Sequence, residues 1–116
     1  MISLRHWRTL HLAVHRDPVF TALLRRTLDD ASYRALQLAL LLRPEQGAII
    51  AGSGGLRKLR VALPPRGKRG GLRVIYYWDA VSGTLYLLYL YKKSEHGDLT
   101  PSQVKQLRHV VEEEFG

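Results

Sequence analysis

The hydrophobic pattern of this chain changes from helical to alternating near Gly55, and this change constrains the fold more than any other feature. Before it, apolar residues recur at helical spacing; after it, they alternate with polar residues, as in strands that bury one face. Three segments alternate in this way: residues 56–63, 72–79 and 85–92. The connections between them are short, which predicts an antiparallel sheet.

Two helices are predicted ahead of this sheet. Asp17-Pro18 is typical of a helix start, with Asp as the N-cap and Pro at the first helical position. Asp29 or Asp30 is expected to cap a second helix that runs to about Arg43, before a proline. Residues 8–14 are expected to form a short strand.

A third helix is predicted at the C-terminus. The run Thr100-Pro101-Ser102-Gln103 fits a capping box with Pro at the first helical position. The expected fold class is therefore α+β, with N-terminal helices packed on a twisted antiparallel sheet of three to four strands and a C-terminal helix. The chain has 116 residues, so we expect one domain over residues 1–116.

Composition excludes several classes of protein. There is no cysteine, which rules out disulfide scaffolds, thiolate metal sites and thiol nucleophiles. No apolar run approaches the roughly 18 residues of a membrane span, and residues 1–6 lack the apolar core of a signal peptide. We therefore expect a cytoplasmic protein that does not bind membranes.

The positive charge is concentrated in one stretch of sequence. The formal net charge is +8, and no acidic residue lies between Glu45 and Asp79. Glycines are interleaved with the cations there, and glycine lets backbone N–H groups approach a phosphate. A nucleotide-binding P-loop is excluded, because Gly67-Lys68 is followed by Arg69 rather than Ser or Thr. The stretch favours a polyanionic partner and holds seven cations: Arg57, Lys58, Arg60, Arg66, Lys68, Arg69 and Arg73.

Alternation brings several of these cations to one face. If Val74 and its alternate neighbours point to the core, Arg73 is exposed on the opposite face. If Tyr86, Leu88 and Leu90 point inward, Tyr91 points outward in the same way. An RNA-cleaving site that uses the 2′-hydroxyl as nucleophile needs no metal, but it needs a proton acceptor, a proton donor and positive charge at the phosphate. The candidate catalytic residues are Lys58, Arg60, Arg73, Lys93 and Glu95.

The remaining basic and aromatic residues of this region are candidates for binding RNA. Tyrosines on the exposed face could stack on unpaired bases, although cross-strand packing explains Tyr77 equally well. His11 and His15 are four residues apart, but the local pattern is strand-like and no third ligand is near, so we expect no metal and no cofactor. The candidate RNA-binding residues are Arg57, Arg66, Lys68, Arg69, Tyr77, Tyr91 and Lys92.

Three motifs in this order resemble the RelE/HigB toxins of bacterial type II toxin–antitoxin modules. They are Gly52-Ser53-Gly54-Gly55-Leu56-Arg57-Lys58-Leu59-Arg60, then Gly67 to Tyr77, then Tyr91-Lys92-Lys93-Ser94-Glu95 with Asp98-Leu99-Thr100. The resemblance extends from about Tyr33 to Leu107. It implies a RelE-like fold and an mRNA interferase, an endoribonuclease that cuts mRNA on the ribosome and inhibits translation.

The resemblance also implies a partner and residue roles. The partner is a cognate antitoxin, a helix-turn-helix HigA-like protein that holds the toxin inactive. Lys58 and Arg60 match basic residues of the catalytic strand, and Arg73 matches an arginine that contacts the scissile phosphate. Lys93 and Glu95 match a basic residue and an acid near the last strand. Ser94 replaces the usual asparagine.

Two other functions remain open on the same fold. One is binding of structured RNA without cleavage, and the other is a toxin that targets gyrase. The gyrase-targeting branch generally lacks the set of basic residues seen here. The resemblance leaves open whether Glu95 or Lys93 is the general base.

Overall fold

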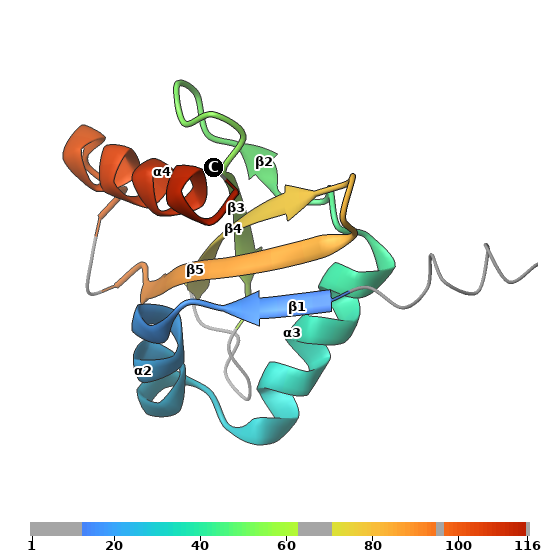
Figure 1. Cartoon of the computed structure of the whole chain (residues 1–116). Coiled ribbons are helices and arrows are strands. Elements are labelled where there is room, and N and C mark those ends of the chain that lie inside the picture. Colours follow the sequence, from blue (N-terminus) through green and yellow to red (C-terminus); the bar gives the residue numbers. More distant parts are fainter. Residues whose placement is uncertain (1–12, 63–70, 95–96, 116) are drawn as a thin grey trace, which may run out of the picture.

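The structure, a computed structural model, describes residues 13–62, 71–94 and 97–115 and places a sheet between two layers of helix (Figure 1). Helices α2 and α3 cover one face of the sheet, and α4 lies on the other face. This arrangement confirms the predicted α+β class. In chain order the elements are β1 (Ala13–Arg16), α2 (Pro18–Thr27), α3 (Asp30–Leu42), β2 (Ala48–Ile49), β3 (Arg57–Val61), β4 (Leu72–Asp79), β5 (Thr84–Lys92) and α4 (Pro101–Phe115).

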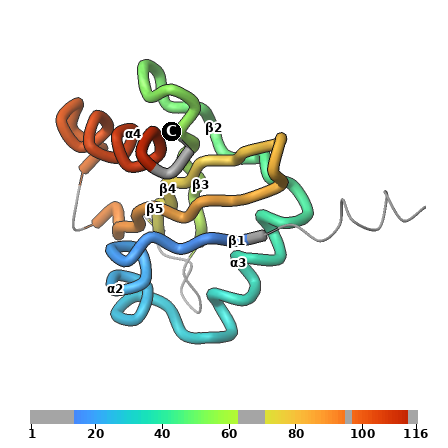
Figure 2. The backbone as a smooth tube through the Cα atoms, in the orientation of Figure 1, coloured from blue at the N-terminus to red at the C-terminus, as the bar shows by residue number. Residues whose placement is uncertain are grey.

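The sheet has five strands in the order β1-β5-β4-β3-β2. The pairs β2–β3, β3–β4 and β4–β5 are antiparallel, as predicted, but β1 runs parallel to β5. The prediction of a purely antiparallel sheet with three to four strands is therefore wrong at its edges. Helices and three further strands separate β1 from β5 in sequence, and a connection of that length permits parallel pairing. Figure 2 shows the two strands side by side.

The two edge strands are the elements that the sequence pattern located least well. Strand β1 runs to Arg16, two residues past the predicted end at residue 14, and residues 8–12 of the predicted strand lie outside the described part of the chain. Strand β2 has only two residues, too few to show a period.

The helix caps follow the sequence signals closely. The Asp17 carboxylate accepts a hydrogen bond from the Val19 N–H at 2.8 Å, and Asp29, rather than its neighbour, accepts one from the Ser32 N–H at 2.8 Å. At α4, the Thr100 N–H donates to Gln103 Oε1 at 2.9 Å while the Gln103 N–H donates to Thr100 Oγ1 at 3.1 Å. This reciprocal pair is the predicted capping box.

The larger hydrophobic core lies between the sheet and the α2–α3 layer. Helices contribute the fully buried Phe20 and Leu40, and β4 contributes Val74 and Tyr76. The burial of Val74 and Tyr76 confirms the predicted inward face of β4. Together the buried members are Phe20, Leu24, Leu36, Leu40, Leu72, Val74, Tyr76, Leu85, Leu87 and Leu90.

A second, smaller core lies under α4. Its buried residues are Leu56, Ile75, Leu88, Tyr91 and Val111. Leu88 belongs here because β4 and β5 change register at this point: Ile75 is opposite Tyr89, whereas Tyr76 is opposite Leu87. The extra residue is a β-bulge, and it reverses which side chains of β5 face α4.

The bulge corrects the predicted faces of β5. Leu90 packs in the core beneath α2 and α3, as expected, but Leu88 and Tyr86 pack on the α4 side. Strict alternation cannot anticipate this, because one inserted residue shifts every later side chain to the other face. None of the helices in the described ranges is long and apolar enough to cross a membrane.

Candidate functional site

The strand register places three of the predicted catalytic residues on one face of the sheet. Lys58 is opposite Ile75 and Arg60 is opposite Arg73, while Arg73 is opposite Tyr91 on its other side. Residues directly opposite each other in a ladder share a face. This is the α4 side of the sheet, because Ile75 and Tyr91 belong to the core under α4. We call Lys58, Arg60, Arg73 and Lys93 the cationic cluster.

Arg73 and Tyr91 are buried, so their predicted exposure is wrong. Arg73 is 7% exposed and Tyr91 is 6% exposed. Arg73 sits on β4, which has strands on both sides, and Tyr91 packs in the core under α4. The prediction treated this face of the sheet as open, whereas α4 covers part of it. The Tyr91 ring is consequently not available for stacking on a base in this conformation.

Two cations face each other within the cluster. Arg60 is exposed, and Arg73 is directly opposite it across β3 and β4. Like charges directly opposite each other in a sheet destabilise it. An anion between two guanidinium groups relieves this repulsion and accepts charge-assisted hydrogen bonds from both. The pair is therefore suited to hold a phosphate.

Asp98 joins the other two cations of the cluster. Its Oδ1 lies 3.6 Å from Lys58 Nζ and 3.5 Å from Lys93 Nζ. The positive charge of Lys58, and then that of Lys93, lowers the pKa of the Asp98 carboxyl below its ordinary value. Asp98 thus draws a side chain of β3 toward one just past the end of β5.

Tyr91 connects the two halves of the cluster. Burial raises the pKa of its hydroxyl; the Asp98 charge adds to the rise and the Arg73 charge opposes it. The hydroxyl therefore lies in the electrostatic field of both residues. One continuous polar region therefore lies at this end of the sheet, and it contains Arg73, Tyr91, Asp98, Lys58 and Lys93.

Sequence reasoning did not assign a role to Asp98. Its signal was available, because it is the acidic residue two positions before the Thr100 cap and lies within a motif that resembled the toxin family. Asp98 belongs to the loop before α4 and not to a strand, so strand alternation gives no information about it.

Arg57 and Lys92, two predicted RNA-binding residues, lie on the opposite face. The Arg57 guanidinium donates from Nη1 to the carbonyl oxygens of Glu45 at 2.9 Å and Gly47 at 2.8 Å. Lys92 is opposite Leu72, which is buried beneath α2 and α3. Arg57 therefore fixes a turn of the backbone, and neither residue is part of the cationic cluster.

Tyr77 does lie on the α4 face, opposite Tyr86. It is half-buried and packs against the core under α4. Its ring also lies close to Gly55, where a Cβ would be 3.1 Å from Tyr77 Cε1. These contacts suit the packing role, and base stacking by Tyr77 remains a prediction.

Several predicted residues lie outside the described part of the chain. They are Glu95, Arg66, Lys68, Arg69 and His11. Among the described residues, no group of three or more His, Asp or Glu is arranged to hold a metal ion.

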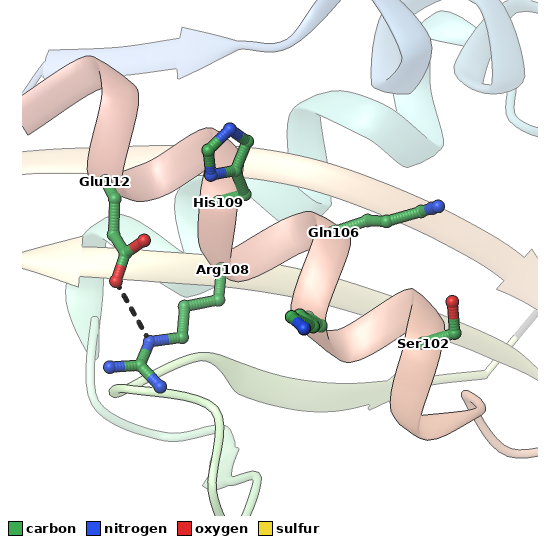
Figure 3. Close-up of a pocket in the computed structure, with 6 residues that line it drawn as sticks. Ser102, Gln106, Arg108, His109 and Glu112 are labelled. Carbon is green, nitrogen blue, oxygen red and sulfur yellow. Dashed lines mark ion pairs between the residues drawn. The ribbon is translucent and has the colours of Figure 1, made fainter.

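The outer side of α4 carries a separate hollow (Figure 3). Ser102, Gln106, Arg108, His109 and Glu112 line it, and Arg108 Nε pairs with Glu112 Oε2 at 3.2 Å. His109 and Glu113 form a second pair at 3.3 Å, one turn along the same helix. These are exposed i,i+4 pairs that support the helix, and the hollow contains no residue of the cationic cluster.

A solved structure shares this arrangement of elements. The chain is similar to the structure of Escherichia coli toxin RelE, an arginine double mutant in the free state, with a TM-score of 0.57 and 14% identity over 86% of this chain and 96% of that one. It is also similar to RelE in an archaeal RelE–RelB complex from Pyrococcus horikoshii OT3, with a TM-score of 0.47 and 22% identity over 73% of this chain and 98% of that one. The first similarity defines the fold as RelE-like.

The family follows from the sequence. A family model described as the RelE toxin of the RelE/RelB toxin–antitoxin system matches residues 21–115. The chain therefore belongs to the RelE toxin family and is a toxin of the toxin–antitoxin class. The match includes α3, all of β2 to β5 and α4, and so contains the whole cationic cluster.

Proposed function

We propose that this toxin is an endoribonuclease that cuts mRNA on the ribosome and thereby arrests translation. The observation that carries the proposal is the convergence of Lys58, Arg60 and Arg73 on one face of the sheet, beside Lys93. Membership of the RelE toxin family supports the same function.

The proposed reaction needs no metal ion. The RNA 2′-oxygen attacks the adjacent phosphorus and loses its proton to a general base. The bond between phosphorus and the 5′-oxygen then breaks, and that oxygen takes up a proton. General acid–base catalysis contributes about 10²–10⁴-fold to such a reaction. Glu95 and Lys93 remain the candidates for the base.

Within this proposal the two arginines hold the phosphate. Arg60 is exposed and reaches the RNA from the rim, while the buried Arg73 is held rigidly on the central strand. A preorganised cation at the developing negative charge is worth more than a mobile one, because the site does not reorganise during the reaction. Lys58 and Lys93 add charge on the Asp98 side.

We also propose an antitoxin partner, of the helix-turn-helix HigA-like kind. An antitoxin that covers the cationic cluster with an acidic segment would associate quickly through complementary charge. A complex that leaves Lys58, Arg60 and Lys93 uncovered, and does not clash with the ribosome, would contradict this mode of inhibition.

The test compares Arg60→Ala with the matched control Arg25→Ala. Arg25 is an exposed arginine on α2, so both variants lose one surface charge and should keep their fold. Each protein is added to an in-vitro translation reaction, and new mRNA 5′ ends are mapped. We expect wild type and Arg25→Ala to cut within translated codons, and Arg60→Ala to cut about 10²–10³-fold more slowly.

The other functions predict different results. Arrested translation with intact mRNA would contradict the nuclease. Salt-sensitive RNA binding without new 5′ ends would identify a non-catalytic RNA-binding protein. Double-strand DNA breaks in cells would indicate a toxin that targets gyrase.

A further inference from the structure

The Asp98 carboxylate lies between the two lysines of the cationic cluster. Its Oδ1 is 3.6 Å from Lys58 Nζ and 3.5 Å from Lys93 Nζ. The exposed fraction is 69% for the Asp98 side chain and 34% and 38% for the two lysines. The three charged groups therefore meet at the surface, where a dissolved anion can reach them.

The backbone around Asp98 explains how the carboxylate reaches this position. Asp98 lies two residues before Thr100, whose capping box fixes the start of α4. Helix α4 is in turn anchored to the sheet through Val111 in the core beneath it. On the other side is Gly97, where a Cβ would meet nothing within 4 Å. The helix start thus places the carboxylate, and the space beside Gly97 is open.

A carboxylate and a phosphodiester make the same demand on these lysines. Both carry a negative charge on oxygen atoms that accept hydrogen bonds from ammonium groups. One oxygen already bridges the two lysines, so a phosphate that binds there competes with Asp98. An exposed ion pair of this kind contributes little to stability, so its loss on RNA binding costs little.

We propose that Asp98 is an internal competitor for RNA: its carboxylate occupies the position between Lys58 and Lys93 that a backbone phosphate of single-stranded RNA takes when it binds. The inference rests on the proposed function, because it takes RNA as the ligand. It differs from a positioning role, in which Asp98 would hold the lysines for RNA and its removal would weaken binding. In the competitor role, removal of the charge strengthens binding.

The expected gain in RNA affinity on removal of the Asp98 charge follows from counterion release. With Asp98 in place, the two lysines and one carboxylate present one net positive charge to RNA. Without the carboxylate they present two, so one more phosphate is neutralised. For a single strand this steepens the dependence of log K on log salt by about 0.7, which corresponds to binding that is about fourfold tighter at 0.15 M salt.

The experiment measures binding of a 2′-O-methyl RNA oligonucleotide, which lacks the nucleophile and cannot be cut. Fluorescence anisotropy gives the Kd and the slope of log K against log salt for wild type and for Asp98→Asn. The salt concentration is varied from about 0.05 to about 0.3 M. The matched control is Asp30→Asn, which makes the same change in net charge at an exposed position at the start of α3.

We expect Asp98→Asn to bind more tightly with a steeper slope, and Asp30→Asn to match wild type. Equal or weaker binding by Asp98→Asn would overturn the inference, and so would an equal gain in both variants, since that would reflect net charge alone. If wild type cuts mRNA but Asp98→Asn leaves the slope unchanged, only the inference fails. If no variant binds RNA and wild type cuts no mRNA, the proposed function fails as well.

Discussion

The Tyr76 side chain stabilises the connection between α3 and the sheet through hydrogen bonds. Its hydroxyl can be removed without changing the shape of the core. The hydroxyl donates to the Pro44 carbonyl at 2.7 Å and accepts from the Gly47 N–H at 2.9 Å. Tyr76 is fully buried, and its cross-strand partner Arg57 holds the Glu45 and Gly47 carbonyls of the same turn. Tyr76→Phe deletes one oxygen and leaves the Gly47 N–H buried without its acceptor.

The cost follows from that buried donor. An unsatisfied buried N–H costs about 1–3 kcal/mol. Unfolding entropy near the midpoint is roughly 2.1 cal/mol/K per residue, so for a chain of 116 residues each kcal/mol lowers Tm by about 4 °C. We therefore expect Tyr76→Phe to lower Tm by about 4–12 °C. Its RNA cleavage below the transition should be unchanged, because the hydroxyl lies on the face opposite the cationic cluster.

Thermal and urea unfolding followed by circular dichroism measure this effect. Thr27→Val is the control: the Thr27 hydroxyl donates to the Leu23 carbonyl within the same helix, so its removal leaves no buried donor. The control should shift Tm much less. The smallest shift expected for Tyr76→Phe is roughly 4 °C. A Tm within about 1 °C of wild type would refute the expected cost of the unsatisfied Gly47 N–H. A loss of cleavage at full stability would refute the separation of this turn from the site.

Two further predictions concern the cluster and the strand that carries it. The Asp98 carboxyl should titrate below its ordinary pKa of 3.8 in carbon-detected NMR, and Lys58→Ala and Lys93→Ala should each raise that pKa, because the charge of each lysine lowers it. Since the folded-state pKa of Asp98 is lowered, the contribution of its contact with the two lysines to stability is present above pH 3.8. That contribution is lost as pH falls through the folded-state pKa. Equal titration of Asp98 in all three proteins would contradict the contact. Gly71→Ala should lower Tm and weaken cleavage together. Gly71 has φ +47°, and a Cβ there would lie 2.7 Å from the Val61 carbonyl oxygen, next to the Arg60–Arg73 pair. Unchanged Tm and activity would show that the strands accommodate the methyl group without cost.

Local signals in the sequence predicted the elements whose physics is local. The Asp17 and Thr100 caps need only residues within one helical turn, and both helices begin where those residues indicate. Strand β4 begins and ends at the predicted residues, 72 and 79, because its pattern alternates without interruption. Strand β1 continues two residues past its predicted end, because its pairing with β5, and not its own short pattern, defines that end.

The site was predicted in part, for the same reason. Lys58, Arg60 and Arg73 share a face because alternation in β3 and β4 is regular and the register is antiparallel. The burial of Arg73 and Tyr91 could not be predicted, since it depends on α4 lying over that face. The bulge at Leu88 depends on how two strands pair, which no single strand shows.

The burial of Arg73 strengthens the proposal of a preorganised phosphate site. Arg73 is 7% exposed, so water screens its charge less than it screens the charge of the exposed Arg60. A phosphate that binds between the two guanidinium groups is therefore attracted more strongly by Arg73 than by Arg60. For this reason Arg73→Lys, which keeps the charge but loses the planar fork of donors, should impair cleavage more than Arg60→Lys at the exposed rim.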